Sequence, residues 1–467
     1  MFETIRNAFK IKDVRRKIFM TLLFIVLFRI GCYIQIPGLN GLGDALESNS
    51  MNIFGLLNSI TGSALSQGTL FSLGISPYIN ASIIVQLLTV AIPALERMSK
   101  EGEEGREKIN KITRWVTLAL AIVSAVGVYL TLSRSTEFTY VNYSWLGGQW
   151  ADFFQTTGGK WIMGIYIVTI LVGGSMLCMW IGERITEYGV SNGISMIIFV
   201  GIISTAAHQL FNTVAGAVQG ESKNWYIALI FIVGLVLVFG FIVWVDGAER
   251  KIKVQYAKQV KGNKMYGGQS TFIPIKVNAS GVMPLIFAYA LMSFPTMLIQ
   301  TFWANSEFAT WWGTYMTANN PTAPNGWVGV VVYNVILAIL IFVFAYFYSQ
   351  IQFNPVEISR NIQNNGGFVT GIRPGRETAE YLAKVVSRIT LWGAVFLAII
   401  AFVPSIMFSI PGWAGLGENL QLVNSMSATG MLICVSVALE FNKALENQIL
   451  MRHYKGLLGS NSKGFLK

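Results

Sequence analysis

The sequence is poor in the residues from which metal centres and disulfides are built. It contains three cysteines and two histidines among 467 residues. Because these residues form no cluster along the chain, a zinc centre has almost no candidate ligands. Cys32, Cys178 and Cys434 each lie in a separate apolar segment, so we expect packing residues rather than disulfides. We therefore expect neither a metal nor any other cofactor.

Charged residues are scarce as well. They make up 12% of the chain, whereas 53% of the residues are hydrophobic and the mean hydropathy is +0.53. One ordinary globular core cannot keep so much apolar surface from water, so most of the chain is expected to face lipid. The sequence also lacks the HExxH, GxSxG and P-loop patterns. A membrane-embedded enzyme would therefore lack visible catalytic machinery.

What the sequence has in abundance is long apolar runs. Ten of them are long enough to span about 30 Å of hydrocarbon as helices. They lie near residues 18–36, 74–93, 115–132, 161–181, 193–212, 225–245, 278–302, 327–348, 386–408 and 425–441.

The positions of lysine and arginine provide an independent test of this topology, because these residues collect on the cytoplasmic side of membrane spans. With few exceptions they fall in alternate connections, at 6–17, 97–114, 184, 250–276, 360–388 and 443–467. This pattern predicts ten spans with both termini in the cytoplasm. The net charge of +11 then reflects topology rather than a nucleic-acid-binding domain.

Few ionisable residues lie at membrane depth. Arg29, in the first run, is the main exception, and we interpret it as a structural arginine that snorkels or pairs internally, with a direct pore role as the alternative. A small-solute secondary transporter would share the topology and the glycine-rich spans. It would also require a coupling ion and a polar site, and the dearth of intramembrane acids argues against both.

Small and weakly polar residues interleave with isoleucine in the segments 74–86 and 190–198. Close helix packing explains them. Alternatively, Ile79 with Ile83, and Ile194 with Ile198, stand four residues apart on one helical face and present pairs of branched side chains to a constriction. The Ser/Gly-rich stretch 55–68 is compatible with a surface loop or with a re-entrant segment buried in protein.

Segments in a consistent order along nearly the whole chain resemble the bacterial SecY family of protein-translocation channels. They are 28–31, 36–38, 74–88, 100–106, 185–195, 254–258, 275–284, 354–355 and 371–375. The resemblance implies an all-α membrane protein with two inverted pseudosymmetric halves of five helices around a central hourglass pore. The halves would be 18–213 and 214–442, flanked by an amphipathic cytoplasmic N-terminus (1–17) and a cytoplasmic tail (443–467). The stretch 55–68 would be the plug of the outer funnel, which favours the re-entrant interpretation.

The resemblance also assigns candidate site residues. The lateral gate would lie between spans two and three on one side and spans seven and eight on the other, with Gln86 and Asn278 as its polar residues. The alternative is that each of the two hydrogen-bonds only within its own half. The cytoplasmic loops 246–276 and 350–385 would carry Arg250, Lys251 and Arg373 as contacts for the ribosome or the SecA motor. The pore ring would consist of Ile79, Ile83, Ile194, Ile198, Ile286 and Ile433.

The implied function is the central channel subunit of the Sec translocon in the bacterial cytoplasmic (inner) membrane. It would pass unfolded, signal-bearing polypeptides across the membrane and release apolar segments sideways into lipid. The implied partners are SecE-type and SecG-type membrane subunits, SecA and the ribosome. Two features depart from the family: Lys251 stands where a second arginine is frequent and lacks its planar fork, and the outer segment 303–327 is long and rich in tryptophan, as in an interfacial aromatic belt.

Overall fold

Helices dominate the fold, and each of the ten apolar runs overlaps one helix of the computed structural model. The structure describes residues 6, 8–40, 61–134, 141–142, 154, 156–218, 225–256, 259–261, 264–266, 270–278, 281, 283–303, 306–316, 326–409 and 428–462. The ten helices are α2 (Lys12–Gly31), α5 (Ser76–Ala91), α7 (Glu103–Arg134), α9 (Thr157–Tyr188), α10 (Gly193–Val218), α11 (Trp225–Asp246), α12 (Met283–Phe302), α14 (Gly326–Gln352), α16 (Arg376–Ser409) and α19 (Ala428–Ser462).

Four stretches of the described chain are long and apolar enough to cross a membrane as single helices: Glu103–Leu130, Gly158–Tyr188, Val328–Asn364 and Arg376–Phe402. A fifth is broken, because α5 turns by 101° into the short helix α6 (Pro93–Lys100). Ile92 is extended at the break and Pro93 follows it, which is the backbone that proline imposes on its predecessor. The count of ten spans remains a prediction.

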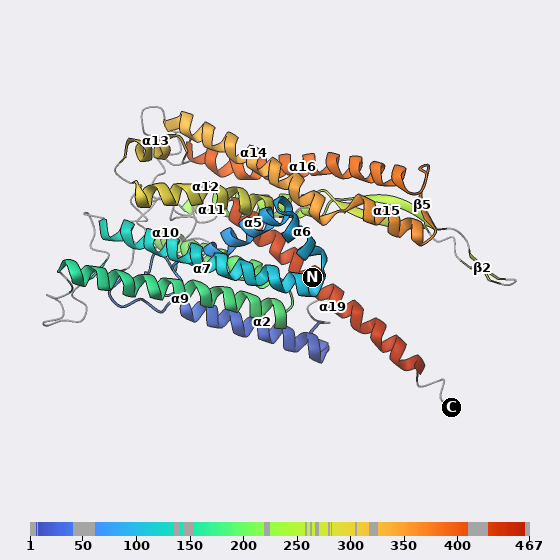
Figure 1. The fold of residues 1–467 in the computed structure, drawn as a ribbon, viewed down its shortest axis with the longest axis horizontal. Coiled ribbons are helices and arrows are strands. Elements are labelled where there is room, and N and C mark those ends of the chain that lie inside the picture. Colours follow the sequence, from blue (N-terminus) through green and yellow to red (C-terminus); the bar gives the residue numbers. More distant parts are fainter. Residues whose placement is uncertain are drawn as a thin grey trace.

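The helices form two groups that face each other (Figure 1). One group contains α2, α5, α7, α9 and α10, and the other contains α11, α12, α14, α16 and α19. The groups meet along two lines: α12 contacts α5 and α7, whereas α11 and α19 contact α10. The main apolar cluster draws residues from both groups, and it includes the three cysteines, which are free and buried as predicted.

The chain between α2 and α5 is irregular, yet residues 61–75 are largely buried against the helices around them. Arg29 Nη1 donates to the carbonyl of Gly62 at 3.4 Å, which fits the internally paired interpretation of this arginine. Ser175 of α9 donates to the carbonyl of Gly74 at 3.1 Å. The described part of the predicted plug, 61–68, is thus largely buried in protein, which favours the re-entrant interpretation, while residues 55–60 lie outside the described residues.

The two predicted cytoplasmic loops contain a sheet that the sequence analysis did not predict. Strand β1 (Glu249–Tyr256) pairs antiparallel with β4 (Ser270–Lys276) on one side and with β5 (Gly367–Val369) on the other. Strands β2 (Gln259–Lys261) and β3 (Lys264–Tyr266) form a separate hairpin. The period-two alternation of Ile252 and Val254 with lysines is the sequence signal for β1.

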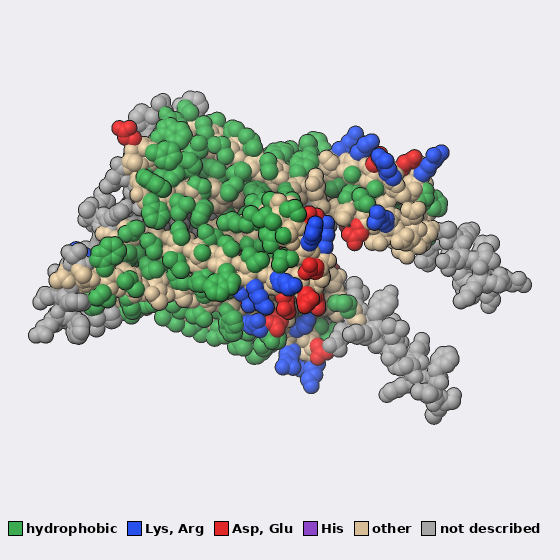
Figure 2. All heavy atoms as spheres, viewed as in Figure 1, with side chains coloured by type: hydrophobic (Ala, Val, Ile, Leu, Met, Phe, Trp, Pro, Cys, Tyr) green, Lys and Arg blue, Asp and Glu red, His purple; other side chains and the backbone are tan. Residues whose placement is uncertain are grey.

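The sheet packs on the short helix α15 (Pro355–Asn364) and the start of α16 through a small apolar core of its own. Figure 2 shows most of the charged side chains gathered at the end of the molecule that holds α6, α15 and β5, with hydrophobic side chains over the remainder of that face. A broad apolar surface with charge at one end is typical of a protein that spans a membrane.

Helix α9 approaches the 61–75 segment at a glycine. A Cβ on Gly174 would lie 1.9 Å from the carbonyl oxygen of Leu70, whereas a Cβ on Gly173 would meet no atom within 4 Å. We therefore predict that Gly174→Val destabilises the protein by about 1–3 kcal/mol through overpacking. Thermal unfolding in detergent measures the effect, and Gly173→Val is the matched control, since it adds the same side chain to the same helix. Equal unfolding temperatures for the two variants would contradict the predicted approach.

Candidate functional site

All six isoleucines of the predicted ring belong to the main apolar cluster or pack against it. Ile79, Ile83, Ile198 and Ile433 are buried members of the main apolar cluster, and Ile194 and Ile286 pack against it partly exposed. They come from α5, α10, α12 and α19, and so from both predicted halves. The structure thus brings together side chains that are separated by up to 354 residues in the sequence (433 − 79).

Local sequence positions the isoleucines of α5 and α10. Pro77 stands in the first turn of α5, where its missing N–H costs nothing. At the start of α10, Asn192 Oδ1 accepts from the backbone N–H of Ile194 at 3.0 Å and so caps the helix. Gly193 allows α10 to approach α9, because a Cβ there would lie 2.0 Å from the carbonyl oxygen of Gly182. The cap and the glycine together fix where Ile194 and Ile198 point.

A cluster of branched apolar side chains between two helical groups can close a passage to ions by excluding water, and it carries no fixed charge that would select among passing chains. Four helices contribute to it. Separating the two groups would therefore open the cluster without breaking any one helix.

A polar contact crosses between the groups beside the cluster. The Tyr348 hydroxyl of α14 donates to Oε1 of Gln86 on α5. Gln86 continues the stripe of Ile79 and Ile83 on α5, since the three are spaced i, i+4 and i+7. Tyr348 packs against the ring of Phe287 with centroids 5.0 Å apart. The predicted gate residue Gln86 therefore bonds across the seam and not within its own half.

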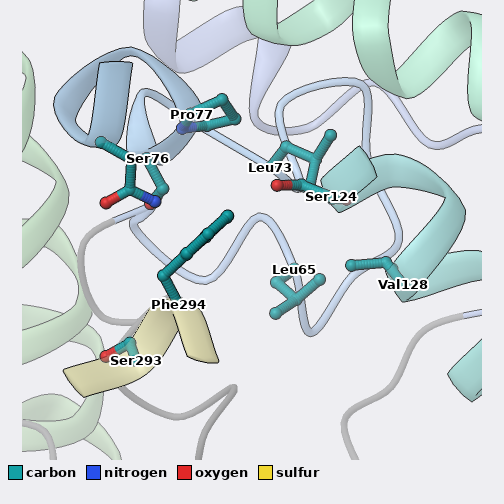
Figure 3. Close-up of a pocket in the computed structure, with 10 residues that line it drawn as sticks. Leu65, Leu73, Ser76, Pro77, Ser124, Val128, Ser293 and Phe294 are labelled. Atoms are coloured by element: carbon teal, nitrogen blue, oxygen red, sulfur yellow. The ribbon is translucent and has the colours of Figure 1, made fainter. Parts of the chain in front are cut away.

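A small cavity of about 40 Å³ lies on the same seam. Ser76 and Asn80 of α5 and Ser124 of α7 line it from one group, and Ser293 and Phe294 of α12 from the other. Figure 3 shows Phe294 projecting from α12 toward the first turn of α5. Most of the surface that lines the cavity is apolar, and its volume is large enough to hold water.

Asn278, the other predicted gate residue, makes a different contact. It precedes α12 rather than lying within that helix, and its Nδ2 donates to Oδ1 of Asp246 at 3.0 Å. Both side chains are buried. Asp246 ends α11, where the helix dipole disfavours a negative charge, so a donor at this position is stabilising. This hydrogen bond joins two elements of the same predicted half and does not cross the seam.

The end of the sheet adds basic side chains to this junction. Burial and the neighbouring ammonium group of Lys443 in α19 lower the pKa of Lys276, while the carboxylates of Asp246 and Glu440 act in the opposite direction. Lys276 closes β4 just before Asn278. The junction therefore links the sheet, α11 and α19 through charged and amide groups.

The three candidate partner contacts lie on the exposed surface of the lobe formed by β1, β4, β5 and α15, which we call the sheet lobe. Arg250 and Lys251 are consecutive in β1, so their side chains leave opposite faces of the strand. Lys251 Nζ pairs with Glu249 at 3.4 Å. Arg373 follows β5, and its carbonyl accepts from the buried Thr378 hydroxyl at 2.8 Å, which fixes the loop that carries it. Pairing of Val254 with Val369 brings the Arg373 loop to the same lobe as Arg250.

Comparison with known proteins bears on this arrangement. The SecY family model matches residues 69–442. The protein translocase subunit SecY of Streptomyces coelicolor is 40% identical, over 98% of this chain and 100% of the relative. The chain belongs to the SecY family. The SecY subunit of Thermus thermophilus is 37% identical over 100% of this chain and 99% of its own.

Solved structures of the family share the fold at lower sequence identity. The structure described as a protein conducting channel matches with a TM-score of 0.63 and 20% identity, over 93% of this chain and 92% of that one. Sec61 in the canine ribosome–channel complex from the endoplasmic reticulum matches with a TM-score of 0.61 and 18% identity, over the same shares. The chain is thus a multi-pass, α-helical membrane protein with the fold of SecY and Sec61 channels.

Sequence reasoning missed Tyr348 and the serines of the seam cavity. Tyr348 ends a stripe of buried residues on α14, which also contains Leu337, Ile341 and Phe344. This stripe could have identified Tyr348, because a hydroxyl group at the end of a buried apolar stripe needs a hydrogen-bond partner. Ser76 and Asn80 lie in the segment 74–86, which close helix packing explains equally well. Ser124 and Ser293 lie outside the segments that the sequence analysis singled out for packing.

We predict that Tyr348→Phe weakens the closed seam by about 0.6 kcal/mol, the mean strength of such bonds between membrane helices, or about threefold in the open-to-closed ratio. Ion conductance of the reconstituted channel measures the ratio. Tyr346→Phe is the matched control, because its hydroxyl donates to Ser387 on α16 at 3.3 Å and does not cross the seam. Equal conductance changes in both variants would contradict the seam assignment.

We predict that Ile286→Asn or Ile433→Asn loosens the closed state and admits precursors with defective signal sequences. An amide in the apolar cluster attracts water and weakens the closure that depends on its exclusion. Translocation of such precursors, together with ion leakage, measures the effect, and Ile286→Leu serves as the control that keeps the side chain apolar. Unchanged signal stringency and ion tightness in both asparagine variants would count against the ring.

Proposed function

We propose that this chain is the central channel subunit of the Sec translocon, which passes unfolded secretory polypeptides across the membrane and releases apolar segments sideways into lipid. The observation that carries the proposal is the isoleucine cluster between the two helical groups, with members on α5, α10, α12 and α19. A flexible apolar closure suits a cargo whose sequence varies, because it offers no charge to bind or repel.

Sideways release is supported by the seam between α12 and α14 on one side and α5 and α7 on the other. Apolar helices in lipid have little hydrophobic drive to stay together, so a seam with one direct hydrogen bond among the described residues and a small cavity opens at low cost. An apolar segment in the pore would exchange contacts with the seam for contacts with lipid. The channel is a passive conduit and needs no catalytic residue of its own.

The energy for transport would come from a partner at the sheet lobe. Relatives of the fold include Sec61 in a ribosome–channel complex. The exposed Arg250, Lys251 and Arg373 suit the phosphates of ribosomal RNA or an acidic surface on the SecA motor. SecE-type and SecG-type subunits would pack against the outer helices.

The gathering of charge at the lobe end supports a cytoplasmic lobe and cytoplasmic termini. The named relatives of Streptomyces and Thermus are bacterial, so the membrane would be the bacterial inner membrane. The halves, 18–213 and 214–442, would be the bodies that part when the seam opens.

The proposal is tested with the chain and its small Sec partners in sealed vesicles, to which SecA, ATP and a signal-bearing precursor are added. We expect protease-protected precursor that depends on ATP and falls by about thirtyfold or more in Arg373→Glu, since losing one partner of a charge pair buried in an interface costs about 2 kcal/mol or more. Lys384→Glu, the same charge reversal on α16, is the control and is expected to retain activity.

Two outcomes would contradict the proposal. Absence of protection for the unmodified chain, together with saturable uptake of a small solute, would support a secondary transporter instead. Protection that is equally reduced in Arg373→Glu and Lys384→Glu would remove the specific role of Arg373.

A further inference from the structure

A short helix outside the proposed pore carries an unpartnered aromatic surface. Helix α13 (Glu307–Tyr315) lies between the outer ends of α12 and α14, at the end of the molecule opposite the sheet lobe (Figure 1). It contacts both helices. Ser306 caps it by accepting from the N–H of Ala309 at 3.2 Å, so its start is fixed by a local hydrogen bond.

One side of α13 is anchored to the protein. The indole Nε1 of Trp312 donates to Oγ1 of Thr296 at 3.0 Å, and Thr296 is 3% exposed on α12. Thr296 follows Pro295 and lies three residues after Ser293, which lines the seam cavity. The anchor therefore holds α12 at the part of the helix that forms the seam.

The other side of α13 is apolar and open. Phe308 is 51% exposed and Trp311 is 47% exposed, and their rings stack with centroids 6.1 Å apart. Trp311 also contacts Tyr315 at 5.7 Å between centroids. These three residues, spaced i, i+3 and i+7, form one stripe along the helix. Trp303, at the end of α12, is exposed beside Phe302.

The scarcity of charged residues in the surrounding sequence and the apolar surface of the neighbouring helix α14 indicate what covers this stripe. Between Val277 and Val356 the sequence contains no lysine, arginine or aspartate, and Glu307 is its one glutamate. The stripe continues the exposed apolar surface of α14, which includes Val331 and Val335. That surface faces lipid in a multi-pass membrane protein. Tryptophan and tyrosine gather where hydrocarbon meets the headgroups, because their rings are apolar and their N–H and O–H groups reach polar partners.

We propose that α13 lies at the outer surface of the membrane that the chain spans, in the interfacial layer. Phe308, Trp311 and Tyr315 would sit among lipid headgroups and the upper parts of the acyl chains. The bilayer thereby holds the outer part of α12 through the Trp312–Thr296 bond. This inference depends on the multi-pass fold and not on polypeptide transport, so it stands or fails separately from the proposed function.

The test uses nitroxide labels on the purified full chain in lipid nanodiscs, free of other proteins. The native cysteines are buried, and unmodified protein serves as the labelling blank. Labels at Phe308→Cys and Trp311→Cys are compared with Val335→Cys on the lipid face of α14 and with Phe368→Cys on the sheet lobe. The readout is the ratio of collisions with oxygen to collisions with a water-soluble nickel complex.

We expect ratios at positions 308 and 311 that lie several-fold above that at 368 and approach that at 335. Ratios equal to that at 368 would place the stripe in water and overturn the proposal. Labels shielded from both oxygen and nickel would show that protein covers the stripe, which also overturns it. Either labelled position suffices if the other variant fails to fold.

The tie to α12 has its own readout. Trp312→Phe keeps the ring and removes the N–H donor, so we expect the label at Trp311→Cys to become more mobile while it stays at the same depth. An unchanged spectral line shape would remove the Trp312–Thr296 bond from the proposal.

Discussion

The structure depends on a seam that must be tight to ions and yet weak enough to part. In water, the hydrophobic effect would drive two apolar helical groups together. Lipid is as apolar as the helices and supplies no such driving force. The seam is therefore held by packing and a few polar contacts. The hydrogen bond from Tyr348 to Gln86 is one such contact. The small cavity lined by Ser76 and Ser293 leaves the packing of the seam incomplete at another place. Elsewhere the two groups meet where α10 packs against α11 and α19.

Tightness of the closed state requires that the groups themselves be rigid. The first group achieves this with close backbone approaches that only glycine permits, at Gly174 against Leu70 and at Gly193 against Gly182. These contacts fix the irregular segment 61–75 and α10 relative to α9. Arg29 adds a hydrogen bond from α2 to the same segment. A frame that does not deform leaves the seam as the place where motion costs least.

The helices were predictable from the sequence, because apolar runs act within one segment. Four-residue spacing placed Ile79 with Ile83, and Ile194 with Ile198, on shared helical faces, whereas the ring as a set of six is what the family resemblance implies. The bounds differ: α2 begins at Lys12, inside the predicted N-terminal segment, and ends at Gly31 rather than near residue 36. The partners of Gln86 and Asn278 were not predictable, since a single polar residue in an apolar run does not specify which helix will face it. The strands were missed because the lysines that alternate with Ile252 and Val254 also satisfy the charge rule for cytoplasmic loops.

The sheet is the feature through which a partner's push would reach the seam. Strand β1 begins two residues after the end of α11, and β4 leads through Asn278 into α12. The two strands pair over seven register positions, so the sheet is connected directly to both helices. The Asp246–Asn278 hydrogen bond ties the two connections at the membrane surface. Because β5 adds the Arg373 loop to β1, a displacement at Arg373 moves a hydrogen-bonded sheet rather than a flexible loop. A rigid sheet transmits such a displacement to the start of α12. The outer part of α12 is held at Thr296 by the hydrogen bond from Trp312. The helix that borders the seam is therefore constrained near both of its ends.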